Sequence, residues 1–243
     1  MTYLVYCILR GDGQTHGSLP LAGSQESVCL VTEQGLAAAV SQVLDSDVRP
    51  TVRRLRTFAA VIEGLHEMHT VLPMRYGCLL PTRAQVVALL RERGPEFADA
   101  LDGVEGCTEM SIRAILDEKR IATSSPPAPF DLPDVSVGKA YLAARKANYA
   151  RQTLSAQAAT AIVERAAAVL RGLFVRYVSE YSPFPSAPYD VPMLSLHFLV
   201  RRAHIESFRR VFRMLEFSES AKMLLSGPWP PYNFVQVEKG QFP

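Results

Sequence analysis

The sequence lacks the long apolar run that a membrane-spanning helix needs, since no stretch approaches the roughly 20 consecutive apolar residues of such a helix. An apolar run at Met193–Val200 is short and is interrupted by Ser195 and His197. The segment Met1–Arg10 also lacks the basic region followed by an apolar region that marks a secretory signal. We therefore expect a cytosolic protein with no membrane partner.

An excess of charge of one sign is also missing. The chain has 243 residues with 26 Lys and Arg against 24 Asp and Glu, which gives a net charge of +2. Nucleic-acid-binding proteins usually show a basic stripe, so we expect no nucleic-acid partner. The hydrophobic fraction of 48% is that of an ordinary globular chain, long enough for one large domain or two small ones.

Cysteine is scarce and scattered. The four cysteines are Cys7, Cys29, Cys78 and Cys107, and none forms a Cys-x-x-Cys pair. Cysteines in such positions are typical of free thiols that serve as small core residues in a reducing compartment.

Signatures of catalysis are absent. The sequence has no glycine-rich phosphate-binding motif, and His66 and His69 are three residues apart, whereas a zinc protease helix needs a spacing of four. Glu105 and Glu109 flank Gly106 in a predicted turn, where solvated carboxylates are expected rather than an acid–base pair. The sequence therefore predicts a protein that is not an enzyme and that binds neither a metal nor a cofactor.

Hydrophobic periodicity predicts an α+β domain in the first half. Strands are expected at Tyr3–Leu9, Val28–Thr32, Val71–Leu80 and Glu109–Glu118, and helices at Gly35–Leu44, Thr51–His69, Thr82–Gly94 and Pro95–Leu101. Thr82 opens a Thr-x-x-Gln capping box. Pro73 marks its strand as an edge or a bulge, because proline lacks the N–H that a ladder needs. The order of elements suggests a ferredoxin-like sandwich.

A proline-rich stretch, Ala122–Pro133, separates this domain from a second one. An alanine-rich region from Ser136 to about Tyr181 follows, as one long helix or as two helices joined near Thr153–Ser155. A strand at Val191–Arg201, an amphipathic helix from Ile205 and strands at Met223–Leu225 and Asn233–Val237 are then expected around a rigid Gly227–Pro231 turn. The predicted domains are residues 1–121 and 134–243, joined by a linker at 122–133.

Two clusters point to an interface. The segment Thr70–Gly77 reads T-V-L-P-M-R-Y-G, and an arginine inside an apolar strand is costly unless it is paired or faces outward. Arg75 therefore indicates either an edge strand with an outward side chain or an edge that recruits a partner strand.

The second cluster is Ser226–Val235, which reads S-G-P-W-P-P-Y-N-F-V and contains the only tryptophan. Its prolines and glycine would hold Trp229, Tyr232 and Phe234 in a stiff path, and preordered aromatic side chains lose little entropy when they bind a partner. The alternative is that these side chains cover the core of the second domain, and both roles can coexist.

These clusters resemble motifs of the gas vesicle protein F/L family. Thr70–Gly77 is similar to the family's T-V-L-P-M-R-F-G, with Tyr76 in place of the commoner phenylalanine. Gly138–Leu142 resembles the G-x-x-Y-L that opens its long helix, and Gly227–Val235 matches the G-P-W-P-P-Y-x-F ending almost letter for letter. The resemblance covers nearly the whole chain, and the compact length favours the F branch.

The resemblance implies an accessory component of the gas-filled protein shells that give aquatic microbes buoyancy, located at the gas vesicle within the cytoplasm. It implies contact with the small hydrophobic shell protein GvpA and with other accessory proteins, in order to nucleate the vesicle or to keep GvpA from aggregating. It also implies two ferredoxin-like α+β domains without catalytic residues or cofactors. The competing interpretation of the residues is a ferredoxin-like module that binds a small ligand or regulates another protein.

The motifs supply the candidate residues. Those expected to bind a partner are Met74, Arg75, Tyr76, Trp229, Tyr232 and Phe234. Those expected to shape the backbone are Pro73, Gly77, Gly138, Tyr141, Leu142, Gly227, Pro228, Pro230 and Pro231.

Overall fold

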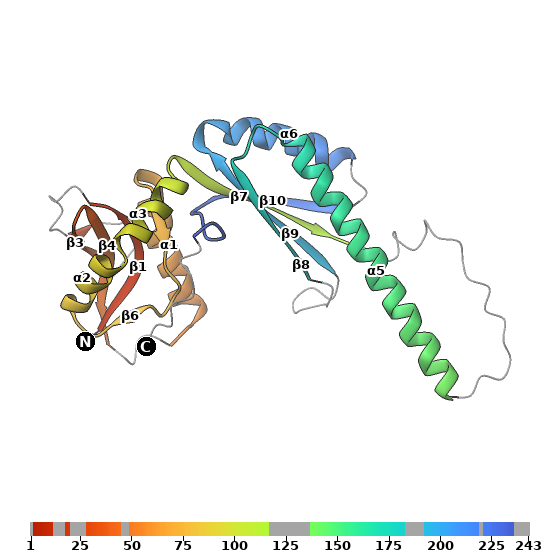
Figure 1. Cartoon of the computed structure of the whole chain (residues 1–243), viewed down its shortest axis with the longest axis horizontal. Helices are drawn as coiled ribbons and strands as arrows, with labels where there is room; N and C mark the ends of the chain where they lie inside the picture. The colour runs from red at the N-terminus through yellow and green to blue at the C-terminus, as the bar shows by residue number, and fades with distance from the viewer. Residues whose placement is uncertain are drawn as a thin grey trace. The chain divides into compact units, whose positions relative to one another are not determined.

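The structure, a computed structural model, describes residues 2–11, 18–19, 28–44, 49–116, 137–182, 192–218 and 221–235. The chain forms two compact units, Met1–Glu109 with Pro228–Pro243, and Met110–Gly227. Each unit packs helices on a sheet, which confirms the predicted α+β class (Figure 1). The extents differ from the expected domains, because residues 110–116 group with the second unit and residues from Pro228 onward group with the first. The predicted linker at 122–133 lies outside the described residues.

The first unit is built around β1, Thr2–Arg10, in a six-stranded sheet of order β2-β3-β4-β1-β5, with β6 also paired to β1. The other strands are β2 Ser18–Leu19, β3 Val28–Glu33, β4 Leu36–Val43, β5 Val71–Pro73 and β6 Leu79–Leu80. Six consecutive residues of β1, Leu4–Leu9, are buried. Since neighbouring side chains of a strand point to opposite faces, both faces of the sheet are covered at β1.

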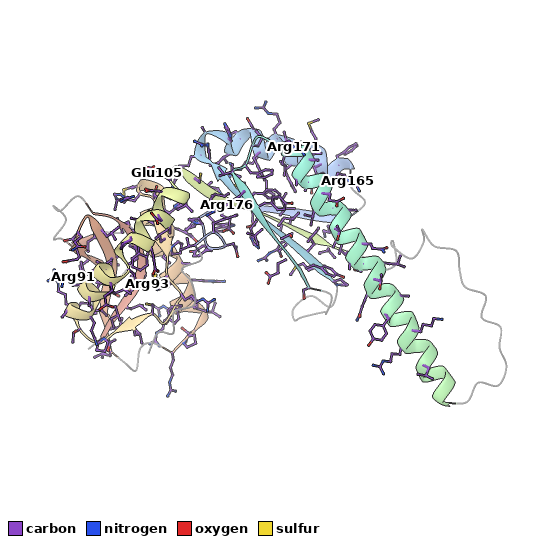
Figure 2. All side chains as sticks on the ribbon, viewed as in Figure 1. Arg91, Arg93, Glu105, Arg165, Arg171 and Arg176 are labelled. Carbon is purple, nitrogen blue, oxygen red and sulfur yellow. The ribbon has the colours of Figure 1, made fainter. Side chains whose placement is uncertain are left out.

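Three helices cover this sheet: α1 Val52–Met68, α2 Arg83–Glu92 and α3 Gly94–Gly103. The predicted capping box is confirmed at Thr82, whose side chain accepts the N–H of Gln85 while the Gln85 side chain accepts the N–H of Thr82. On α2, Arg91 (labelled in Figure 2) donates to the Glu33 carboxylate at 2.9 Å, so the helix is tied to β3. The apolar stripe of α1 packs into the same core as β1.

The predicted helix at Gly35–Leu44 is wrong, because these residues form β4. Gln34 and Gly35 both have positive φ, 47° and 79°, the backbone of a two-residue hairpin turn between β3 and β4. The run Leu36–Val40 is almost fully buried in the sheet. Burial among strands therefore outweighs the helix propensity of three consecutive alanines.

The second unit has the elements β7 Cys107–Ile115, α5 Val137–Val169, β8 Arg176–Ser182, β9 Met193–Arg201, a 3₁₀ turn Arg202–His204, α6 Ile205–Ser218 and β10 Lys222–Trp229. Its order β-α-β-β-α-β and its sheet order β10-β7-β9-β8 are those of a ferredoxin-like sandwich, as predicted. Both helices contribute to a single core cluster with the sheet. No helix in the described parts of the chain is long and apolar enough to span a membrane.

The long helix is shorter than expected. It is one helix ending at Val169, and the part of the predicted helix from Arg176 to Tyr181 is instead β8. Gly172, with φ 84°, lies in the turn that reverses the chain. Ala159, Ile162, Ala166 and Leu170 of this region pack on the sheet, whereas the first half of α5 projects beyond it (Figure 1).

We predict that Gly35→Ala destabilises the first unit by about 1–2 kcal/mol, because a Cβ atom is unfavourable in the left-handed region. Gly94→Ala is the matched control, since Gly94 begins α3 with ordinary φ and an added Cβ meets only Leu36 Cδ1 at 3.9 Å. Urea unfolding followed by tryptophan fluorescence reports on this unit, because Trp229 belongs to it. Equal stability of the two variants would contradict the hairpin turn.

Candidate functional site

The segment Ser226–Val235, called the tail below, differs from the structure predicted for it. β10 continues through Gly227 and Pro228 to Trp229, so the expected rigid turn at Gly227 does not form. The chain turns at residues 232–234 instead, where the N–H of Phe234 donates to the carbonyl oxygen of Pro231 at 3.1 Å. A strand starting at Asn233 is therefore wrong, and residues 236–237 lie outside the described residues.

A buried carboxylate holds this turn in the first unit. Glu109 accepts the backbone N–H of Asn233 at 2.9 Å and its side-chain amide at 2.7 Å. The Thr108 hydroxyl donates to the carbonyl oxygen of Trp229 at 2.8 Å. Glu109 is only 2% exposed, which corrects the expectation of a solvated carboxylate there; Glu105 is exposed. Burial of an ionised group is costly unless it is hydrogen-bonded, so the contact fixes the tail.

The aromatic residues of the tail differ in burial. Phe234 is 7% exposed, whereas Trp229 is 37% exposed and Tyr232 is 40% exposed. Partial burial raises the pKa of the Tyr232 hydroxyl, and the nearby Glu63, Cys7 and Glu109 raise it further, so the phenol is neutral at ordinary pH. The tail is therefore in part a cover and in part a surface, and it covers the first unit rather than the second.

The Thr70–Gly77 motif lies in the same unit. The predicted single strand Val71–Leu80 is interrupted: β5 ends at Pro73, β6 begins at Leu79, and Gly77 has a φ of 88° between them. β5 lies at one end of the described strand order, where a proline is tolerated.

The partner candidates in this motif also divide by burial. Met74 is 9% exposed, and its N–H donates to the carbonyl oxygen of Tyr6 at 2.8 Å. Tyr76 is half-buried against Phe58, with ring centroids 5.2 Å apart. Arg75 is exposed, as the interpretation of an outward side chain requires.

The Thr70–Gly77 motif is paired to β1, where Cys7 is opposite Pro73. Burial strongly raises the pKa of the Cys7 thiol, and all four cysteines are free. The sequence assigned this motif and the segment Trp229–Val235 to different domains, whereas the structure places both in the first unit.

The third motif belongs to the second unit. Gly138, Tyr141 and Leu142 lie in the first turns of α5, and the Leu142 side chain is 63% exposed. Among the described residues no cluster of His, Cys, Asp or Glu could hold a metal ion.

Sequence reasoning missed the polar residues that anchor the tail. Thr108 is fully buried, and its Oγ1 lies 3.4 Å from Nε2 of His66, which is also buried in the last turn of α1. Nothing local distinguishes Glu109 from other strand glutamates, because its partner Asn233 is 124 residues away. The only available signal was the turn-forming character of Asn233 after two prolines.

We predict that Glu109→Gln releases the tail, since each hydrogen bond to the carboxylate contributes about 1.5–3 kcal/mol and an amide nitrogen cannot accept. Trp229 is the only tryptophan, so its fluorescence reports directly on the release of this segment. Its emission should shift to longer wavelength, and its indole should become more accessible to acrylamide. Glu105→Gln, an exposed neighbour (Figure 2), should leave both unchanged. Unchanged emission in Glu109→Gln would show that other contacts fix the tail.

Comparison with known proteins agrees with this fold. A family model described as gas vesicle synthesis protein GvpL/GvpF matches residues 2–236. Gas vesicle protein F of Streptomyces sp. (strain CB03234) is 26% identical over 97% of this chain and 100% of its own length. The crystal structure of GvpF from Anabaena sp. PCC7120 shares the fold, with a TM-score of 0.76 and 16% identity over 98% of this chain and 99% of that chain. The crystal structure of GvpF from Microcystis aeruginosa also shares the fold, with a TM-score of 0.71 and 15% identity over 97% of this chain and 99% of that chain. The chain therefore belongs to the GvpL/GvpF family of gas vesicle synthesis proteins.

Proposed function

We propose that this protein binds the gas vesicle shell protein GvpA and assists nucleation and assembly of the vesicle in the cytoplasm. Membership of the family gives the chain an accessory role in gas vesicle synthesis. The observation that supports the finer proposal is the state of Trp229 and Tyr232, which are more than a third exposed on a backbone fixed by Glu109.

This state suits recognition of an apolar partner. A small hydrophobic shell subunit exposes apolar surface and sheet edges before assembly, and a partner must cover them. Trp, Tyr and Arg are the residues that dominate binding free energy at protein interfaces. We therefore assign the contact to Trp229, Tyr232, Arg75 and Tyr76.

The two remaining candidates are assigned a supporting role. Met74 and Phe234 are buried, so they position their exposed neighbours rather than touch a partner. We propose that the protein acts by binding and not by catalysis. Its buried carboxylate, Glu109, has both oxygens engaged by Asn233, so neither is directed at a substrate.

Co-expression with tagged GvpA tests the proposal. We expect the two proteins to elute together, GvpA to stay soluble, and the Trp229 emission to shift to shorter wavelength as the indole is covered. The double variant Trp229→Ala/Tyr232→Ala should weaken binding by about thirtyfold or more, the loss expected of a hot spot. Tyr149→Ala, which removes a tyrosine that is 57% exposed on α5, is the matched control.

The outcomes separate the interpretations. Full binding by a folded double variant would remove the tail from the interface while leaving GvpA as the partner. Absence of a complex between folded wild-type proteins would contradict GvpA binding. A thermal shift with a metabolite would then favour the ligand-binding alternative.

A further inference from the structure

Among the described residues, the sheet of the second unit ends in a strand whose outer edge is not paired. β8 is the last strand of the described sheet, and it pairs with β9 alone, from Arg176 opposite Leu199 to Ser182 opposite Met193 without a shift (Figure 1). The first five residues of β8 are all exposed. A strand covered on one face shows alternating burial, so this run indicates that neither face is closely covered at these positions, and the strand order leaves the outer edge of β8 unpaired among the described residues.

β8 carries two charged residues, Arg176 and Glu180, but it lacks the other features that discourage edge pairing. An open edge presents a row of backbone N–H and C=O groups, and natural proteins blunt such edges with lysine, proline or a bulge. The strand reads R-Y-V-S-E-Y-S, without lysine or proline, and its register with β9 is regular. The edge is therefore a straight template for a further strand.

The two faces of β8 differ. Tyr177 is opposite Phe198 of the core, and their ring centroids are 5.6 Å apart, so odd-numbered positions of β8 face the helices. Arg176, Val178 and Glu180 therefore lie together on the other face. Val178 is 41% exposed there.

This face is complementary to itself. When two copies of β8 run antiparallel about a two-fold axis at Val178, Arg176 of each copy lies opposite Glu180 of the other. Opposite charges in directly facing positions stabilise a strand pair. An axis at Glu180 places like charges together, and axes at Tyr177 or Ser179 leave both charges without a directly facing opposite charge. The register centred on Val178 is therefore favoured.

We propose that this protein forms a two-fold symmetric dimer through β8, which joins two four-stranded sheets into one continuous sheet. The same residue of each copy meets across the axis, as a self-complementary interface requires. The helices of both copies then lie on the same face of the joined sheet. This inference is independent of the tail motif and of GvpA. A segment of GvpA could use the same backbone groups, but the paired charges favour a second copy.

Charge reversal tests the register by sedimentation equilibrium of the full chain. The wild type should reach twice the mass of one chain in a concentration-dependent manner. Arg176→Glu and Glu180→Arg should each weaken the dimer more than about tenfold, because each places two like-charged pairs at the interface. An equimolar mixture of the two variants should form a heterodimer, since every facing pair is again of opposite sign. The double variant Arg176→Glu/Glu180→Arg should dimerise alone.

Cross-linking gives a second readout that does not depend on charge. Val178→Cys places two thiols at the axis, where facing Cα atoms of antiparallel strands are about 4.5–5.5 Å apart, within disulfide range. Mild oxidation should produce a covalent dimer, whereas Leu224→Cys, exposed by 63% on β10, should give no covalent dimer on a denaturing, non-reducing gel. The proposal would be overturned by a monomeric wild type, by a dimer that neither charge reversal weakens, or by a mixture of the two variants that forms no heterodimer. Each of these outcomes would overturn it even if β8 were found to bind GvpA.

Discussion

The hydrogen bonds between Glu109 and Asn233 determine where the segment Trp229–Val235 lies. Pro230 and Pro231 have no N–H, so this segment cannot be held by a strand ladder. Glu109 in turn is buried and needs donors. The backbone and side chain of Asn233 supply two donors, and the carboxylate and the tail therefore require each other.

This constraint explains how exposed aromatic residues remain ordered. An exposed aromatic side chain on a free tail would lose backbone entropy on binding, at about 1–2 kcal/mol per residue fixed. Here the backbone at Trp229 and Asn233 is already held by Thr108 and Glu109. The burial of Phe234 adds an apolar anchor. Such preorganisation is what makes a short segment useful as a binding surface.

Elements with local signals were predictable from the sequence. The capping box at Thr82, the stripe of α1 and the strand and helix at β9 and α6 depend on residues a few positions apart. β4 was mistaken for a helix because its alanines carry no strand signal without their neighbours in the sheet. The tail was placed in the wrong domain because its anchor is 124 residues away.

The candidate site shows the same limit at the level of single residues. Within each motif, residues close together in the sequence differ in burial: Met74 is buried beside exposed Arg75, and Phe234 is buried five residues after exposed Trp229. Only the fold decides which member of each pair faces solvent.

The two surfaces proposed for this protein, the tail and the edge of β8, would bind through different interactions. The tail presents aromatic side chains on a fixed backbone, whereas β8 presents backbone groups and a pair of opposite charges. Substitutions at Arg176 or Glu180 therefore leave the tail intact, so dimerisation and GvpA binding are separable. A dimer would carry two tails, and a shell assembled from many identical subunits offers repeated sites. If a proposed dimer bound GvpA through both tails, the second contact would be intramolecular, and an assembling shell would be bound far more tightly than a single subunit.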